Sequence, residues 1–138
     1  MSSNIIDYVT IASTGNALDF GDLAVGVYDS AGASSGTKTL FLGGNSGARI
    51  NVIQFITTAT TGNASDFGDL SADSMDRASS SGNNTRLIVF GGRGTSLSLT
   101  NTIQYVTTSS LGNSVDFGDL VQSVYHNSSA SNAHGGLS

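Results

Sequence analysis

The 138-residue sequence contains no cysteine, no proline and no tryptophan. The lack of cysteine excludes a disulfide framework and a thiolate metal site. Charged residues make up only 11% of the chain and its five basic residues are scattered, so we expect no surface for a nucleic-acid backbone. The longest apolar runs span about four residues, whereas a membrane-spanning helix needs about 20, so we expect no membrane insertion.

Helical and targeting signals are also lacking. Residues 1–4 are neither basic nor strongly apolar, so we expect no signal peptide. No long segment combines a helical period with capping residues. The chain has instead 38% apolar residues, in short β-branched and aromatic clusters, and 18 glycines. Strands with frequent turns, rather than disorder, are typical of this composition. We therefore predict an all-β fold in a single domain, 1–138.

Three phrases recur in the same order at a period of about 48 residues. A Gly-Asn turn that leads into Asp-Phe-Gly-Asp-Leu occupies 15–23, 62–70 and 112–120. A β-branched and aromatic phrase precedes it at 5–10, 52–57 and 102–107. An apolar phrase that ends in two glycines occupies 40–44 and 88–92. The chain is therefore built from three copies of one repeat.

Each phrase is typical of a strand or a turn. The stretch 103–108 alternates partially, as in a half-buried strand. The apolar run 86–90 indicates a strand buried on both faces. It ends at Gly91 and Gly92, where a close backbone approach or a positive φ would exclude a side chain. Small residues at 78–82 indicate a tightly packed inner strand. One repeat thus contains about four short strands in about 48 residues, and this strand number and length are typical of a propeller blade.

The repeat resembles the kelch family of β-propellers over nearly the whole chain. The pairs Gly43-Gly44 and Gly91-Gly92 correspond to the family's double glycine. The aromatic residues of the third strand correspond to its tyrosine, at Tyr8, Phe55 and Tyr105. The phenylalanines of the last strand stand roughly where the family has tryptophan, at Phe20, Phe67 and Phe117. The sequence around Asp-Phe-Gly-Asp-Leu also resembles repeats of phage fibre or appendage proteins. These resemblances imply a propeller and, for a phage protein, a location in the virion.

The register of the repeats divides the chain into four parts. Residues 4–23 supply strands three and four of a split blade, 24–70 and 71–120 are complete blades, and 121–138 supply strands one and two of a split blade. The last assignment rests on the similarity of 124–127 to 27–30.

Three blades cannot close a ring well, so we expect assembly in which one copy completes the split blade of another. Two chains would give a six-bladed ring, and a trimer is the second choice. Such closure would also remove exposed strand edges. The residues expected to complete the blade between chains are Ile5, Ile6, Tyr8, Val9, Val124, Tyr125, Ala130, Ala133 and His134.

Motifs with possible chemistry have structural explanations. Asp-Phe-Gly lacks the other kinase motifs and recurs at the structural period. The paired aspartates fall short of a calcium site, so we expect one of each pair to bond to nearby backbone, at Asp19/Asp22, Asp66/Asp69 and Asp116/Asp119. The two histidines lack metal-ligand spacing. No metal or cofactor is expected.

We expect a non-enzymatic binding or structural module, with a glycan or surface receptor as its ligand. Function would then reside in the loops 45–49, 93–100 and 73–83, which differ between copies. The alternatives are a glycan-active enzyme, for which Tyr28, Tyr125 and His126 are the only candidate residues, and a self-assembling repeat without a ligand.

Overall fold

A computed structural model describes residues 1–71 and 75–131. Within these ranges the chain forms ten β-strands and no helix. Every strand pairing is antiparallel. The predicted all-β fold is confirmed.

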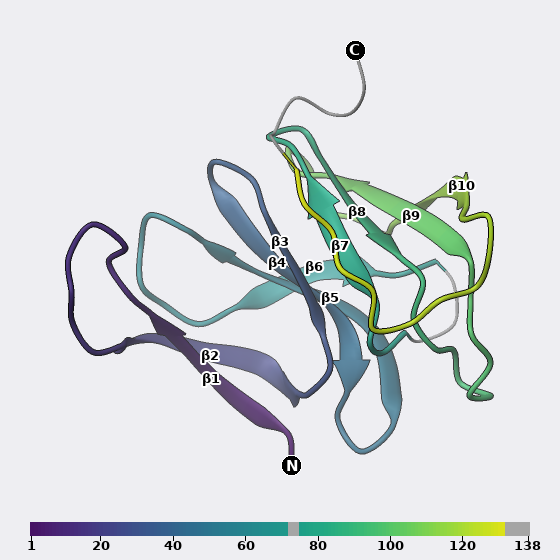
Figure 1. The fold of residues 1–138 in the computed structure, drawn as a ribbon. Helices are drawn as coiled ribbons and strands as arrows, with labels where there is room; N and C mark the ends of the chain where they lie inside the picture. The colour runs from purple at the N-terminus through teal and green to yellow at the C-terminus, as the bar shows by residue number, and fades with distance from the viewer. Residues whose placement is uncertain (72–74, 132–138) are drawn as a thin grey trace.

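The strands form three sheets in the order of the repeats (Figure 1). The first unit is a two-stranded sheet of β1 (Ser3–Tyr8) and β2 (Leu18–Val27). The second unit is a meander of β3 (Ala31–Ser34), β4 (Lys38–Asn45), β5 (Arg49–Thr57) and β6 (Ser65–Asp69). The third unit repeats that meander with β7 (Ser79–Gly82), β8 (Arg86–Phe90), β9 (Thr102–Thr107) and β10 (Val115–Asp119).

The phenylalanine of the Asp-Phe-Gly phrase has the same place in each unit. In the second unit Gln54 pairs with Asp66 and Ile53 with Gly68, so Phe67 is the extra residue of a β-bulge. The other two units show the same register shift. The bulged ring meets the aromatic residue of the preceding strand edge to face, at centroid distances of 5.9, 5.8 and 6.0 Å for Tyr8–Phe20, Phe55–Phe67 and Tyr105–Phe117.

The β2 strand is longer than its phrase predicts. It extends to Val27, which pairs with Ser3 across a bulge. Val25 is held at both backbone groups by the Gln54 amide of the second unit. Contacts outside the phrase therefore extend the strand beyond Leu23.

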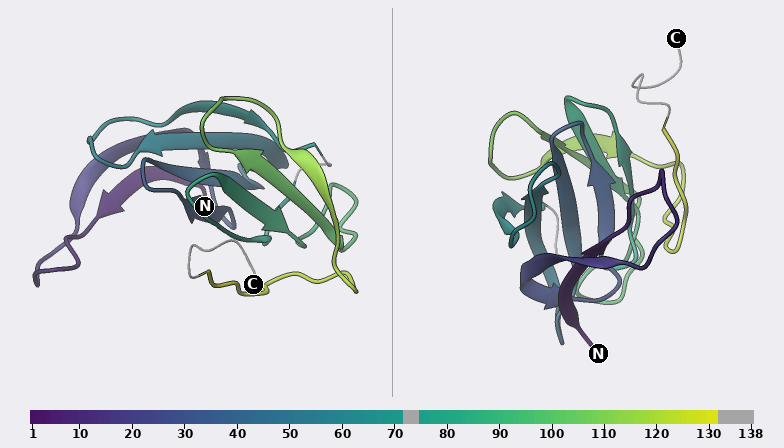
Figure 2. Two further views of the ribbon diagram at one scale, coloured as in Figure 1. Left: turned by 90° about the horizontal axis from the view of Figure 1, so that it is seen from above. Right: turned by 90° about the vertical axis from the view of Figure 1, so that its left-hand side faces the viewer.

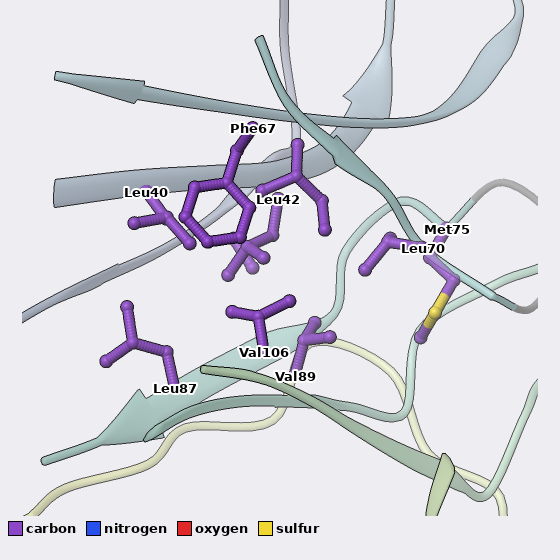
Figure 3. Packing of buried hydrophobic residues seen from close by; sticks show 10 residues of the cluster. Leu40, Leu42, Phe67, Leu70, Met75, Leu87, Val89 and Val106 are labelled. Carbon is purple, nitrogen blue, oxygen red and sulfur yellow. The ribbon is translucent and has the colours of Figure 1, made fainter. Parts of the chain in front are cut away.

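The hydrophobic core lies between the sheets. Between the second and third units it includes Leu40, Leu42, Phe67, Leu70, Met75, Leu87, Val89 and Val106 (Figure 3). A smaller cluster between the first and second units includes Ile6, Phe20, Leu23, Ile56 and Ala64. Each large buried side chain contributes roughly 1.5–3 kcal/mol. The face-to-face contact of neighbouring units thus holds the fold together.

The units follow one another along an arc (Figure 2). The segment after β10 returns along the concave side of this arc, where it lies beside β7. The described residues close no ring.

Candidate interface between repeat units

The contact between neighbouring units is the most elaborate arrangement of polar groups in the described residues. We call its outer part the outer lock: the Gly-Asn turn of one unit bound to the Phe-Gly-Asp phrase of the unit before it. The backbone N–H groups of Gly62 and Ala64 donate to the carbonyls of Phe20 and Asp22 at 2.7 and 2.8 Å. The Asn63 Oδ1 accepts the Asp22 N–H at 3.0 Å.

The next pair of units repeats the outer lock. Gly112 and Ser114 donate to the carbonyls of Phe67 and Asp69, both at 2.8 Å. The Asn113 Oδ1 accepts the Asp69 N–H at 3.0 Å. The same three hydrogen bonds therefore join the first unit to the second and the second to the third.

The glycine of the Phe-Gly-Asp phrase makes this approach possible. A Cβ atom on Gly21 or Gly68 would lie 2.4 Å from the carbonyl oxygen of Gly62 or Gly112. Both glycines have φ of +147°, a backbone conformation that L side chains rarely adopt. The position therefore requires glycine for space and for backbone angle.

A glutamine lies deeper in each contact. The Gln54 amide donates to the Val25 carbonyl at 3.0 Å and accepts the Val25 N–H at 2.8 Å. In the next contact the Gln104 Oε1 accepts from the Ser71 N–H at 2.8 Å and from the Ser114 hydroxyl at 2.6 Å. Both glutamines are buried. These hydrogen bonds satisfy amides whose burial would otherwise cost free energy.

The double glycines form the inner part of the contact. The N–H of Gly44 donates to the Met75 carbonyl at 2.7 Å, and a Cβ atom on Gly43 would lie 2.4 Å from that oxygen. Gly92 makes the same 2.7 Å bond to the Val124 carbonyl. All four glycines of the pairs have positive φ. Both properties expected at these glycines, close approach and positive φ, are present.

The C-terminal segment 124–131 makes the same contacts to the third unit that β7 and the turn before it make to the second unit. Arg77 donates its N–H to the Asp29 carbonyl, and His126 donates in the same way to Arg77. All three residues have φ near +55°, at 57°, 56° and 54°. The hydroxyl of Ser80 donates to the Gly32 carbonyl, and that of Ser129 donates to the Ser80 carbonyl. Residues 124–131 thus stack on the third unit as β7 and its preceding turn stack on the second.

A buried ion cluster surrounds Asp76. Its carboxylate receives hydrogen bonds from Arg93 Nε and Nη2, both at 3.1 Å. Arg49 contributes charge without an aligned hydrogen bond, because its buried Nε lies 3.1 Å from Oδ2 but has no hydrogen-bond partner. Burial alone would raise the pKa of Asp76, but the hydrogen bonds from Arg93 and the positive charges of Arg93 and Arg49 lower it below its usual value of 3.8.

The structure separates the residues that the sequence assigned to blade completion. Ile6 is buried against the second unit, whereas Ile5, Tyr8 and Val9 are exposed. Val124 lies by the double glycine that follows β8, and Tyr125 lies beside Arg93. Ala130 lies in the segment that runs along β7. The predicted Ala133 and His134 lie outside the described residues.

Two of the three residues considered for an enzyme lie together. The rings of Tyr125 and His126 have centroids 4.9 Å apart, and the Arg93 guanidinium lies 6.0 Å from the Tyr125 centroid. Tyr28 lies at the corresponding turn before the second unit, where it forms a β-bridge with Asn45. Tyr28 thus lies by the 45–49 loop through Asn45, and Tyr125 lies by the 93–100 loop through Arg93.

The polar groups that join the units were not predicted from the sequence: Asn63, Asn113, Gln54, Gln104 and Asp76. The Gly-Asn pair of all three repeats predicts a local turn, but it does not identify the distant backbone groups that the turn binds. Gln54 and Gln104 occupy the same position of the aromatic phrase, where the first repeat has Asp7, and this recurrence is their only signal in the sequence. The position of Asp76 opposite Arg93 repeats that of Tyr28 opposite Asn45, and the repeat alignment could have revealed it.

Together the sheets and their contacts define a class of protein: an all-β repeat protein whose units stack through a recurring interface. Scans of protein-family models and of curated proteins found no match. In the described ranges no cluster of three or more His, Cys, Asp or Glu could hold a metal ion. Those ranges also contain no helix that is long and apolar enough to cross a membrane.

Proposed function

We propose that this protein is a non-enzymatic structural and binding module that works as a β-propeller ring assembled from more than one copy of the chain. Two chains, with six blades, are the first choice, and three chains are the second. The stacking of residues 124–131 on the third unit carries this proposal.

The first support comes from the hydroxyl groups of that segment. Ser129 and Ser131 donate to the carbonyls of Ser80 and Gly82, as Ser80 donates to Gly32 one unit earlier. The segment therefore has the place of the first strand of a fourth blade. The strands that correspond to the outer half of a blade are β1 and β2, and a second copy can provide them.

The β1 strand offers the matching edge. Both β5 and β9, its counterparts, are paired on two sides, whereas β1 pairs only with β2 among the described residues. An isolated two-stranded sheet is marginally stable in water, and an open edge invites further pairing. Pairing with the C-terminal part of a second copy would complete a four-stranded blade and close the ring.

Ligand binding is the second part of the proposal. The 45–49 loop lies by Tyr28, and the 93–100 loop lies by Tyr125 and His126. Leu97 and Leu99 are exposed in the second loop. Exposed aromatic and apolar groups on loops of a rigid scaffold suit recognition of a glycan or a receptor surface. A role in a phage appendage would fit such recognition.

Two measurements test the proposal. Multi-angle light scattering should give about twice the chain mass of 14.0 kDa, or three times for the trimer. A glycan array should show saturable binding without turnover. A stable monomer that unfolds cooperatively would contradict the ring, and turnover of a bound glycan would favour the enzyme.

A further inference from the structure

We propose that the copies join head to tail through an outer lock formed between chains, in which Asn16 of one copy binds Asp119 of the next. This inference rests on the proposed ring and identifies the surface that closes it. The head face is defined by Val9 and residues 15–17. The tail face is defined by Phe117, Gly118, Asp119 and Leu120.

The two faces are unused halves of an interface that the chain shows twice. The Gly-Asn turn at 62–63 binds the phrase at Phe20, and the turn at 112–113 binds the phrase at Phe67. The Gly15-Asn16 turn has no earlier phrase to bind within the described residues. The phrase at 117–119 likewise has no later turn.

Burial follows the same pattern. Phe20 and Phe67, which the next unit covers, are 9% and 2% exposed, whereas Phe117 is 56% exposed. On the opposite faces Ile56 and Val106 are 7% and 2% exposed, whereas their counterpart Val9 is 57% exposed. The apolar residue that closes each internal contact is therefore uncovered on both terminal faces.

The space beside Gly118 also indicates that a Gly-Asn turn binds the tail face. A Cβ atom on Gly21 or Gly68 would collide with the following turn, whereas one on Gly118 meets nothing within 4 Å. Gly118 nevertheless has φ of +140°, close to the +147° of the other two. The tail face thus has the backbone shape that receives a Gly-Asn turn, and no described residue occupies the place of that turn.

A second copy is the occupant that fits all of these features. It supplies Gly15 and Ala17 N–H groups for the Phe117 and Asp119 carbonyls, and the Asn16 oxygen for the Asp119 N–H. Asp7, which takes the place of Gln54 and Gln104, supplies carboxylate acceptors for backbone N–H groups after Leu120. A head face cannot bind another head face in this way, so the contact has one direction and suits a cyclic ring.

Two blocked variants test this direction. Val9→Asp places a charge on the head face, and Phe117→Asp places one on the tail face. Both side chains are more than half exposed in the single chain, so each variant should remain folded by circular dichroism. Each should be monomeric alone, and an equimolar mixture should form a heterodimer through the one intact joint. A dimer of either variant alone, or no complex in the folded mixture, would contradict the inference.

A milder substitution tests the hydrogen bond itself. Asn16→Ala should lower the affinity of each joint about fivefold. A closed dimer contains two joints, so its dissociation constant should rise by the product of the two effects, about 25-fold. Asn63→Ala is the matched control, because the same bond lies inside the chain: it should lower the urea midpoint and leave the dissociation constant unchanged. If the wild type is a monomer, the proposed ring fails. If it is an oligomer that Asn16→Ala and both aspartate variants leave intact, only this inference fails.

Discussion

The substitution Gly68→Ala probes the outer lock most sharply. The new Cβ atom would lie 2.4 Å from the Gly112 carbonyl oxygen, so the turn at 112–114 must move away. The variant also holds alanine at φ of +147°, which costs about 1–3 kcal/mol. Three hydrogen bonds, each contributing roughly 0.5–1.5 kcal/mol, join this phrase to the turn. We expect a loss of roughly 3–6 kcal/mol in the free energy of unfolding.

The control is Gly118→Ala, which has nearly the same backbone angle and no neighbour within 4 Å. It should cost only the backbone strain, about 1–3 kcal/mol. Both substitutions are best made in the Val9→Asp background, so that assembly does not contribute. Urea unfolding followed by circular dichroism measures both losses. Equal losses for the two glycines would refute the role of Gly68 in the contact between units.

Three further predictions concern the buried groups. Gln104→Leu should lower the unfolding free energy by about 1–3 kcal/mol, measured in urea, because the Ser71 and Ser114 donors lose their buried acceptor. An unchanged midpoint would contradict this. Phe67→Ala should cost about 3–5 kcal/mol through the cavity left between the second and third units, whereas Phe117→Ala, on an exposed ring, should cost much less in the monomer. Similar losses would argue against the burial described. Asp76→Asn should remove part of the acid sensitivity of folding. The folded pKa of Asp76 is lowered, so its stabilisation is complete above the unfolded value of 3.8 and is lost as the pH falls through the folded value. The difference in stability between wild type and variant should therefore shrink below pH 3.8, and a constant difference from neutral to acid pH would contradict the pKa assignment.

The repeated phrases were sufficient to predict the strands. Apolar alternation and glycine punctuation are local signals, so they identified β4, β5, β8 and β9, and the all-β class followed. The close backbone approach and the positive φ predicted at the double glycine are confirmed. Few other physical constraints explain two consecutive glycines at the end of an apolar strand.

The contact between units could not be obtained in this way. Asn63 and Asp22 are 41 residues apart, and Asn113 and Asp69 are 44 apart. A local turn signal does not specify such a distant acceptor. The extension of β2 to Val27 has the same origin, because Gln54 of the next unit holds Val25. Asp76 also depends on tertiary contact, since its partners Arg49 and Arg93 come from two different units.

The most direct test of head-to-tail assembly is a cross-link across the proposed joint. The chain has no cysteine, so Ala17→Cys with Asp119→Cys introduces the only two thiols. Inside the chain the corresponding residues, Ala64 and Asp22, are joined by a 2.8 Å backbone hydrogen bond, so cysteines at these positions lie within the span of a short bifunctional thiol reagent. A short bismaleimide should give a covalent dimer on a denaturing gel, with Asp22→Cys and Ala64→Cys as the control that links within one chain. Failure to form links between chains, while the control pair forms its internal link, would contradict the account.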